Sequence, residues 1–272
     1  MRKIHNEYLE HKFELPEKPE RIVSLVSSAT EAIDRMGFHE RLCGVSEYCH
    51  RYIDTSELPV VGQYMTADLE AIQELKPDLV LLTTGIQRRL SKRLAEQGLP
   101  IYNFSLPSSF EGILENIHVL GGLMNELAAA RELTQKLRKQ AEFLRSIHQF
   151  ESRPRVYVEL WLGRHRRAVG GLSYIRDIVE LAGGELVYGE HPEGYFENDF
   201  VDLAKENVDA YVFFHEPEYL VDGKALVRER AWNEGLPVLM STVEVGDNMI
   251  QDGPSMLETV KWLHSELSLH YS

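Results

Sequence analysis

The sequence has only two cysteines in 272 residues, Cys43 and Cys49, and no apolar run near the roughly 18 residues that a membrane span requires. Two thiols do not imply a disulfide framework, and the adjacent Cys49 and His50 do not by themselves predict a metal site. Basic residues are also few, with 29 Lys and Arg against 43 Asp and Glu. The net charge of −14 argues against a nucleic-acid or anionic membrane surface, and an anionic ligand would need a local basic pocket.

The amino-terminal segment, MRKIHNEYLEHKFELPEKPE, lacks the apolar core of a signal peptide. The chain as printed is therefore expected in the cytoplasm, and outside it if a signal or lipoprotein anchor has been removed. Residues 1–20 are polar and contain proline, so we expect an arm rather than a core element.

A long helical pattern without Gly or Pro covers residues 125–150. Leu133, Leu137, Leu144 and Ile147 recur at helical spacing, which gives the helix one apolar face. Asn125 is in position to cap its first turn. At about 1.5 Å per residue the helix would span roughly 37 Å, the width of a domain. It could cover one large domain or join two lobes.

Short apolar strands alternate with amphipathic helices on both sides of this helix, which is typical of mostly parallel sheets covered on both faces. The halves also share patterns: EQGLPIYNF resembles NEGLPVLMS, and residues 69–85 resemble 200–216. We therefore predict an α/β fold of two Rossmann-like lobes joined by one long backbone helix, with a ligand cleft between the lobes. The expected parts are the arm (1–20), an N-terminal lobe (21–124), the helix (125–150) and a C-terminal lobe (151–272).

Four stretches carry a resemblance to a known family: RIVSLVSSATEAIDRMG, CGVSEYCHRY, VVGQYMTADLEAIQELKPDLVLL and VELAGGE. They are similar to the helical-backbone substrate-binding proteins of ABC importers, and within that group to the vitamin B12 (cobalamin) binding proteins. The resemblance covers nearly the whole chain after residue 20. It implies that a ligand is held between the lobes with little hinge motion.

Three positions match the family's functional residues. Tyr48 and Tyr64 stand where the resemblance implies aromatics that line the cleft, and either could instead be a packing residue. Glu70 matches a glutamate that docks on the membrane permease, and it could instead be a solvated helix residue. The second docking acid is not matched, and Asp199 and Asp202 are displaced candidates for it.

The resemblance implies a cobalamin-like corrinoid as the ligand, with haem or a ferric siderophore as the alternative. Thr83 departs from the family, because cobalamin binders can have an aromatic there. Ser27 and Ser28 stand where binders of bare zinc or manganese have a histidine, and they could instead donate to an anionic group at the start of the next helix.

Further candidates follow the strands of the predicted second lobe. Four residues are candidates for the cleft. Trp161 ends the run VYVELW, His215 ends VFFH, and Tyr195 and Phe196 lie in the loop before the segment 200–216. Each could equally pack in the core of the lobe. A basic stretch after VYVELW and a pair after the fourth strand could clamp carboxylates or a phosphate, or be merely solvated. These basic residues are Arg164, His165, Arg166 and Arg167, and Arg88 and Arg89.

An enzyme that handles tetrapyrroles, such as a chelatase, is the alternative from another class. The sequence has no phosphate-binding loop, G-x-S-x-G or H-E-x-x-H motif, and too few cysteines for a metal cluster. We therefore expect a monomeric, non-enzymatic binding protein without a resident cofactor. Its expected partners are a small-molecule metal chelate and an ABC permease.

Overall fold

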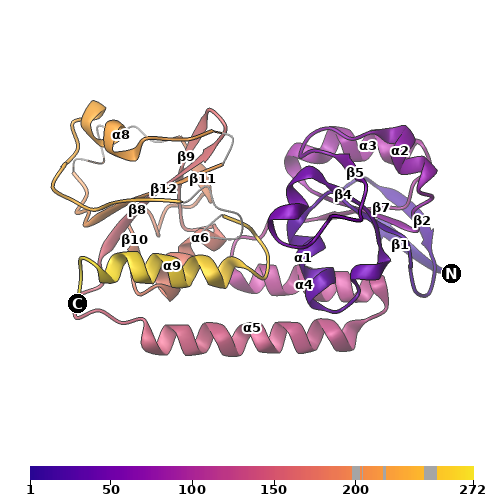
Figure 1. Cartoon of the computed structure of the whole chain (residues 1–272), viewed down its shortest axis with the longest axis horizontal. Coiled ribbons are helices and arrows are strands. Elements are labelled where there is room, and N and C mark those ends of the chain that lie inside the picture. The colour runs from indigo at the N-terminus through magenta and orange to yellow at the C-terminus, as the bar shows by residue number, and fades with distance from the viewer. Residues whose placement is uncertain (198–202, 204, 217–218, 242–249) are drawn as a thin grey trace. The chain divides into compact units, whose positions relative to one another are not determined.

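The computed structural model describes all residues except 198–202, 204, 217–218 and 242–249. The chain forms two compact α/β units (Figure 1). The first contains Met1–Pro107, Ile113–Lys136 and Asp252–Pro254, and the second Ser108–Gly112, Leu137–Gln251 and Ser255–Ser272. The long helix α5 (Leu127–Ile147) contributes residues to both. The predicted pair of α/β lobes joined by one long helix is confirmed.

The apolar face of α5 is buried at Leu133, Leu137 and Leu144, whereas Ile147 is 52% exposed. Asn125 does not cap this helix as expected. Its φ of 58° lies in the left-handed region, and its N–H donates to the carbonyl of Gly122, so it ends the preceding helix α4 (Phe110–Met124).

The first unit contains a five-stranded parallel sheet in the order β5-β4-β3-β6-β7. Its strands are β3 (Ile22–Ser24), β4 (Leu42–Ser46), β5 (Val60–Gly62), β6 (Leu79–Thr83) and β7 (Ile101–Phe104). The strand order reverses between β3 and β6, and ligands of open α/β sheets bind beyond the carboxyl ends of the strands at such a switch point. Val23, Val80 and Ile101 are fully buried in its core.

Three helices of this unit connect the parallel strands: α1 (Ser27–Arg35), α2 (Leu69–Glu74) and α3 (Arg88–Glu96). Helix α4 follows the last strand, β7, and short 3₁₀ turns lie at η1 (His39–Arg41), η2 (Glu47–Arg51) and η3 (Gly85–Gln87). Asp68 caps α2, where its carboxylate accepts a hydrogen bond from the Ala71 amide at 3.0 Å.

The amino-terminal segment differs from the expected arm, because it forms the antiparallel hairpin β1 (Arg2–Asn6) and β2 (His11–Leu15). Leu15 is fully buried, and the buried Asn6 side chain donates to the Ile101 carbonyl at 3.0 Å. The hairpin is therefore part of the first unit's core.

The second unit is built on a mixed sheet in the order β11-β9-β8-β12-β13, and β10 pairs with the start of β8. The strands are β8 (Arg155–Leu162), β9 (His165–Val169), β10 (Glu185–Leu186), β11 (Tyr195–Phe196), β12 (Ala210–His215) and β13 (Val238–Met240). Strands β8, β12 and β13 are parallel, whereas β9 runs antiparallel to β8 and to β11. Helices α6 (Tyr174–Leu181), α8 (Gly223–Glu229) and α9 (Met256–Ser268) belong to this unit.

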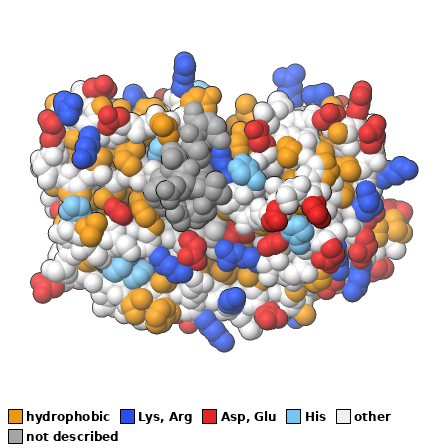
Figure 2. Space-filling view, viewed as in Figure 1, with side chains coloured by type: hydrophobic (Ala, Val, Ile, Leu, Met, Phe, Trp, Pro, Cys, Tyr) orange, Lys and Arg blue, Asp and Glu red, His pale blue; other side chains and the backbone are white. Residues whose placement is uncertain are grey.

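Charged side chains of both signs are interspersed over the face seen in Figure 2, with apolar side chains between them. The acidic excess is thus spread over this face rather than gathered in one area. Within the described part of the chain, no helix is both long and apolar enough to cross a membrane.

Candidate ligand-binding site

Large apolar side chains are exposed on the loops that follow β5, β6 and β7 of the first sheet. Tyr64 is 45% exposed, Met65 60%, Ile86 56% and Leu106 52%. Carboxyl ends of parallel strands meet at one edge of a sheet, so these side chains belong to the same edge. This apolar edge, defined as Tyr64, Met65, Ile86 and Leu106, is a surface suited to a large apolar ligand.

Tyr48 belongs to the same edge of the sheet, because it lies in η2 directly after β4. Its ring is half-buried, and the guanidinium of Arg51 lies 4.6 Å from the ring centroid. Tyr48 and Tyr64 therefore follow neighbouring strands, β4 and β5.

Thr83 is buried at the end of β6, where its hydroxyl donates to the Phe104 carbonyl at 3.3 Å. It contributes no exposed side chain to the edge. Arg88 and Arg89 are exposed at the start of α3, and the Arg88 guanidinium lies 5.6 Å from the centroid of the Tyr8 ring.

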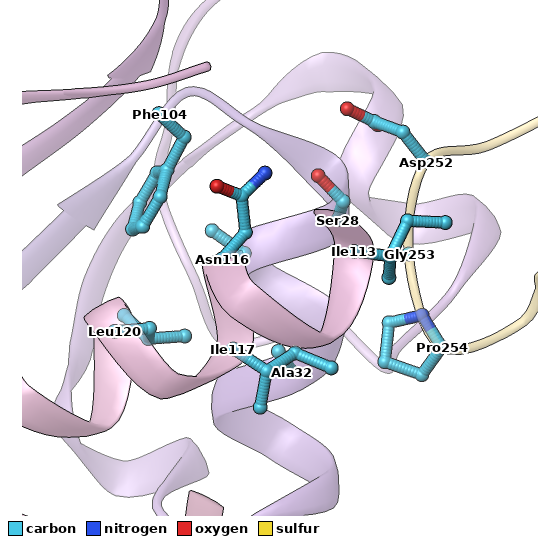
Figure 3. Close-up of a pocket in the computed structure, with 11 residues that line it drawn as sticks. Ser28, Ala32, Phe104, Ile113, Asn116, Ile117, Leu120, Asp252, Gly253 and Pro254 are labelled. Atoms are coloured by element: carbon cyan, nitrogen blue, oxygen red, sulfur yellow. The ribbon is translucent and has the colours of Figure 1, made fainter. Parts of the chain in front are cut away.

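The start of α1 has an acidic neighbour from a distant part of the chain. Ser28 and Asp252 line a small cavity of about 20 Å³ with Asn116, enough room for one water molecule (Figure 3). Burial raises the pKa of Asp252, and a hydrogen bond from Ser28 partly offsets that effect. A carboxylate of the chain thus lies where the sequence suggested that Ser27 and Ser28 could bind an anion.

Three predicted residues of the second unit form one row across its sheet. Trp161 pairs with His215 of β12 on one side and with Arg166 of β9 on the other. Directly paired residues of neighbouring strands point to the same face of a sheet, so the three side chains share a face. The row lies close to the carboxyl ends of β8 and β12.

Trp161 is held by a buried carboxylate. Glu159 is fully buried and accepts hydrogen bonds from the Trp161 indole at 2.8 Å and from the Tyr157 hydroxyl at 2.7 Å. The Arg230 guanidinium binds both of its oxygens, at 2.9 and 3.0 Å. This bidentate pair fixes the plane of the carboxylate and thereby the position of the indole.

His215 presents two different ring nitrogens. Nε2 lies 2.7 Å from the Ser241 carbonyl oxygen and must donate to it, since a carbonyl can only accept. Nδ1 is therefore an acceptor in the neutral ring, and it is buried without a hydrogen-bond partner among the described residues. Such a nitrogen can accept a hydrogen bond or ligate a metal.

The remaining predicted residues of this unit lie on or near the edge strands. Arg164 is exposed in the turn between β8 and β9. Tyr195 and Phe196 were expected in a loop but form β11, beside β9. Tyr195 accepts a hydrogen bond from the Ser173 hydroxyl at 3.1 Å, and Phe196 stacks on His191 with 3.7 Å between centroids. Phe196 packs against the same apolar cluster as Trp161, so the sheet brings these two together.

The predicted docking acid Glu70 is exposed in the first turn of α2. Its proposed counterpart Asp202, like Asp199, lies outside the described residues. Cys43 and Cys49 are free thiols, and no group of three His, Cys, Asp or Glu among the residues that the model describes could hold a metal ion.

Four residues of the candidate site are not predicted from the sequence: Met65, Ile86 and Leu106 at the apolar edge, and Glu159 behind Trp161. The first three could have been found by their position, because each follows a predicted strand of the first lobe. Glu159 lies inside an apolar strand, where only a buried partner could justify a charge.

Comparisons with known proteins agree with this architecture. The family model of the periplasmic binding proteins matches residues 22–234. A cobalamin-binding protein of Halobacterium salinarum is 31% identical over 177 residues, which are 64% of this chain and 47% of that protein. The high-affinity heme uptake system protein IsdE of Staphylococcus aureus is 30% identical over 165 residues, 59% of this chain and 54% of that protein. The chain thus spans about half the length of these two relatives.

A solved structure extends the likeness over almost the full chain. The periplasmic heme-binding protein HutB of Vibrio cholerae superposes with a TM-score of 0.76 at 17% identity, covering 93% of this chain and 99% of that one. At this identity the likeness concerns the fold alone. The family match covers well over half of the sequence, and the chain therefore belongs to the periplasmic binding protein family.

Proposed function

We propose that the protein is the substrate-binding component of an ABC-type importer and that it binds a flat metal macrocycle, a cobalamin-like corrinoid first and haem second. It acts by sequestering the ligand and catalyses no reaction. The observation that carries the proposal is the apolar edge, Tyr64, Met65, Ile86 and Leu106, at the carboxyl ends of the first sheet.

The apolar edge suits a macrocycle because a corrin or porphyrin ring offers a broad face to bury. Each Å² of apolar surface that is buried contributes about 25 cal/mol, so burial of one face of such a ring against the apolar edge supplies a large part of the binding free energy. Tyr64 and Tyr48 add aromatic faces with a polar hydroxyl at one end, which is a common feature of ligand pockets. Corrinoid is ranked first because the cobalamin-binding relative is slightly more similar than the haem-uptake relative.

The second unit has predicted ligand contacts of its own. Trp161 and Phe196 supply further aromatic surface on one face of the second sheet, whereas Tyr195, the neighbouring residue of β11, points to the other face. Arg164 and Arg166 supply positive charge for the phosphate of a corrinoid or the carboxylates of haem. A ferric siderophore would need the same positive charges but less aromatic surface, so it ranks below both macrocycles.

Haem is kept as the second candidate because of His215. Its buried Nδ1 has no hydrogen-bond partner among the described residues and is an acceptor in the neutral ring. A histidine nitrogen in that state is a common axial ligand of haem iron. A Soret band that shifts on binding, and that changes in a His215→Ala variant, would favour haem over a corrinoid.

Work with an importer requires the protein outside the cytoplasmic membrane. Fractionation of cells that produce the protein from its own gene tests that location. The permease is the proposed partner, and Glu70 is the proposed docking residue.

The test is a titration of the purified protein with cyanocobalamin, haemin and a ferric siderophore, followed by ligand absorbance and Trp fluorescence. One-to-one saturation with one macrocycle supports the proposal and identifies the ligand class. Saturation with the siderophore alone contradicts the macrocycle, and saturation with none contradicts the binding role.

A further inference from the structure

Gln87 is a fully buried amide between the carboxyl ends of β3 and β6, where the first sheet reverses its strand order. Its oxygen accepts from the Thr83 amide at 2.7 Å. Its nitrogen donates to the carbonyl of Leu25 at 3.2 Å and to that of Tyr64 at 2.7 Å. One side chain therefore joins the loops that follow β3, β5 and β6, and it occupies the position where α/β sheets commonly open a ligand crevice.

Polar contacts continue from Gln87 to the amino-terminal hairpin. The Ser91 hydroxyl donates to the Gln87 carbonyl at 2.9 Å, and the Asn103 amide donates to the Ser91 hydroxyl at 2.8 Å. The Asn6 amide of β1 then donates to the Asn103 side-chain oxygen at 3.0 Å. All four side chains are buried, so each lost contact would leave a desolvated polar group.

The tip of the hairpin makes a second connection at the surface. The Tyr8 hydroxyl accepts a hydrogen bond from the Gly85 amide at 2.8 Å, and the Arg88 guanidinium lies over the Tyr8 ring. Gly85 has a φ of 72°, in the left-handed region that glycine adopts readily. Tyr8 thus holds the turn that carries Ile86.

We infer that Gln87 and Tyr8 are positioning residues for ligand binding. Gln87 holds the loop with Tyr64 and Met65, and Tyr8 holds the turn with Ile86. Through these two residues, the hairpin β1–β2 helps to hold the apolar edge in position. Loops held in the bound conformation lose less entropy on binding, so these contacts raise affinity without touching the ligand. The inference rests on the proposed function for its link to a ligand.

The experiment compares the full-length wild type with Gln87→Met and Tyr8→Phe. The control Thr134→Val removes a buried hydroxyl that hydrogen-bonds His118 elsewhere in the first unit. It shows what a general loss of stability does to exchange and to affinity. Hydrogen exchange of single amides is measured by NMR without ligand, together with the melting temperature. Affinity for cyanocobalamin and haemin is measured by titration.

Gln87→Met is expected to speed exchange at Thr83, and at Gln63 and Asp68 in the Tyr64 loop, by about tenfold. Tyr8→Phe should do the same at Gly85. Both variants should bind the macrocycle about fivefold to tenfold more weakly, because one good hydrogen bond corresponds to about that factor. Thr134→Val should change neither the exchange at these amides nor the affinity.

Wild-type exchange rates at these amides in Gln87→Met would overturn the positioning role, whatever the ligand. Faster exchange with wild-type affinity would overturn the link to binding. A wild type that binds neither macrocycle would refute the proposed function instead, and the exchange data would still decide whether Gln87 holds the Tyr64 loop.

Discussion

The imidazole rings of His148 and His264 stack with their centroids 3.7 Å apart and their planes 10° from parallel. His148 follows the end of α5, and His264 lies in α9. The Nδ1 atoms donate to the carbonyls of Leu181 and Ala182, each at 3.0 Å. Both rings therefore bind the carboxyl end of α6 and join three segments of the second unit.

Folding stability should fall when the pH drops below about 6.5, the ordinary pKa of a histidine. Burial is the main cause that lowers the pKa of His148, and the neighbouring His264 adds to it. Between the folded and the unfolded pKa the unfolded chain binds more protons, so stability rises with pH across that window. The contribution of His148 to folding stability is complete above this pH window and is lost as the pH falls through it.

Thermal unfolding between pH 5 and 8 checks this pH dependence. A His148→Asn variant should have a lower melting temperature at pH 8 and a flatter dependence on pH. The exposed His270→Gln variant serves as a control and should follow the wild type. A wild type as stable at pH 5.5 as at pH 7.5 would contradict the role given to the stack.

Neighbouring glycines of α4 should respond oppositely to alanine. A Cβ on Gly121 would overlap the Cβ of Ala130 in α5, whereas a Cβ on Gly122 would have its nearest neighbour, Leu127 Cδ2, at 4.0 Å. We expect Gly121→Ala to destabilise the protein by about 1–3 kcal/mol through overpacking. Gly122→Ala should be neutral or stabilise it by up to about 1 kcal/mol through helix propensity. Urea unfolding of both variants measures these changes in stability. Equal effects would refute the close contact between α4 and α5.

The buried ion pair of Glu159 and Arg230 should be costly to break on one side. Glu159→Gln removes the negative charge that both guanidinium nitrogens of Arg230 contact, at a side chain that is only 8% exposed, and we expect a loss of about 3–5 kcal/mol in urea unfolding. The exposed pair of Glu111 and Arg138 is the control, and Glu111→Gln should change stability by less than about 1 kcal/mol. The double variant Glu159→Leu with Arg230→Met should recover much of the loss. A single variant as stable as the wild type would contradict the coupling.

The docking role of Glu70 predicts a separation of transport from binding. Glu70→Ala should lower the ligand-stimulated ATPase activity of the reconstituted permease while leaving ligand affinity unchanged, because Glu70 is exposed on α2. Glu96→Ala removes an exposed acid from the end of α3 and should leave both quantities unchanged. Reduced ligand affinity in Glu70→Ala would count against a docking role.

Much of the fold follows from local patterns. Leu133, Leu137 and Leu144 repeat at helical spacing and are buried as predicted. The hairpin β1–β2 was missed because its polar, alternating residues look like a surface segment. Its burial depends on distant partners, such as the contact between Asn6 and Ile101, 95 residues apart.

The candidate site was predictable where it coincides with strand ends. Trp161 and His215 lie at or next to the ends of the neighbouring parallel strands β8 and β12, so their position at one edge of the sheet follows from the predicted topology. Tyr195 and Phe196 were expected in a loop, because no α/β pattern specifies the antiparallel edge formed by β9 and β11. Gln87 has no local signal either, since its two carbonyl partners lie 62 and 23 residues away in the sequence.

The central claim is that a macrocycle binds the carboxyl edge of the first sheet. Calorimetric titration of cyanocobalamin, or of haemin if that is the ligand, into Tyr64→Ala and Phe143→Ala tests it directly. Phe143 is the matched control, an aromatic that is 59% exposed on α5. We predict one-to-one binding by the wild type, at least about tenfold weaker binding by Tyr64→Ala, and wild-type affinity for Phe143→Ala. Equal affinity in all three proteins, or no saturable binding by the wild type, would contradict the account.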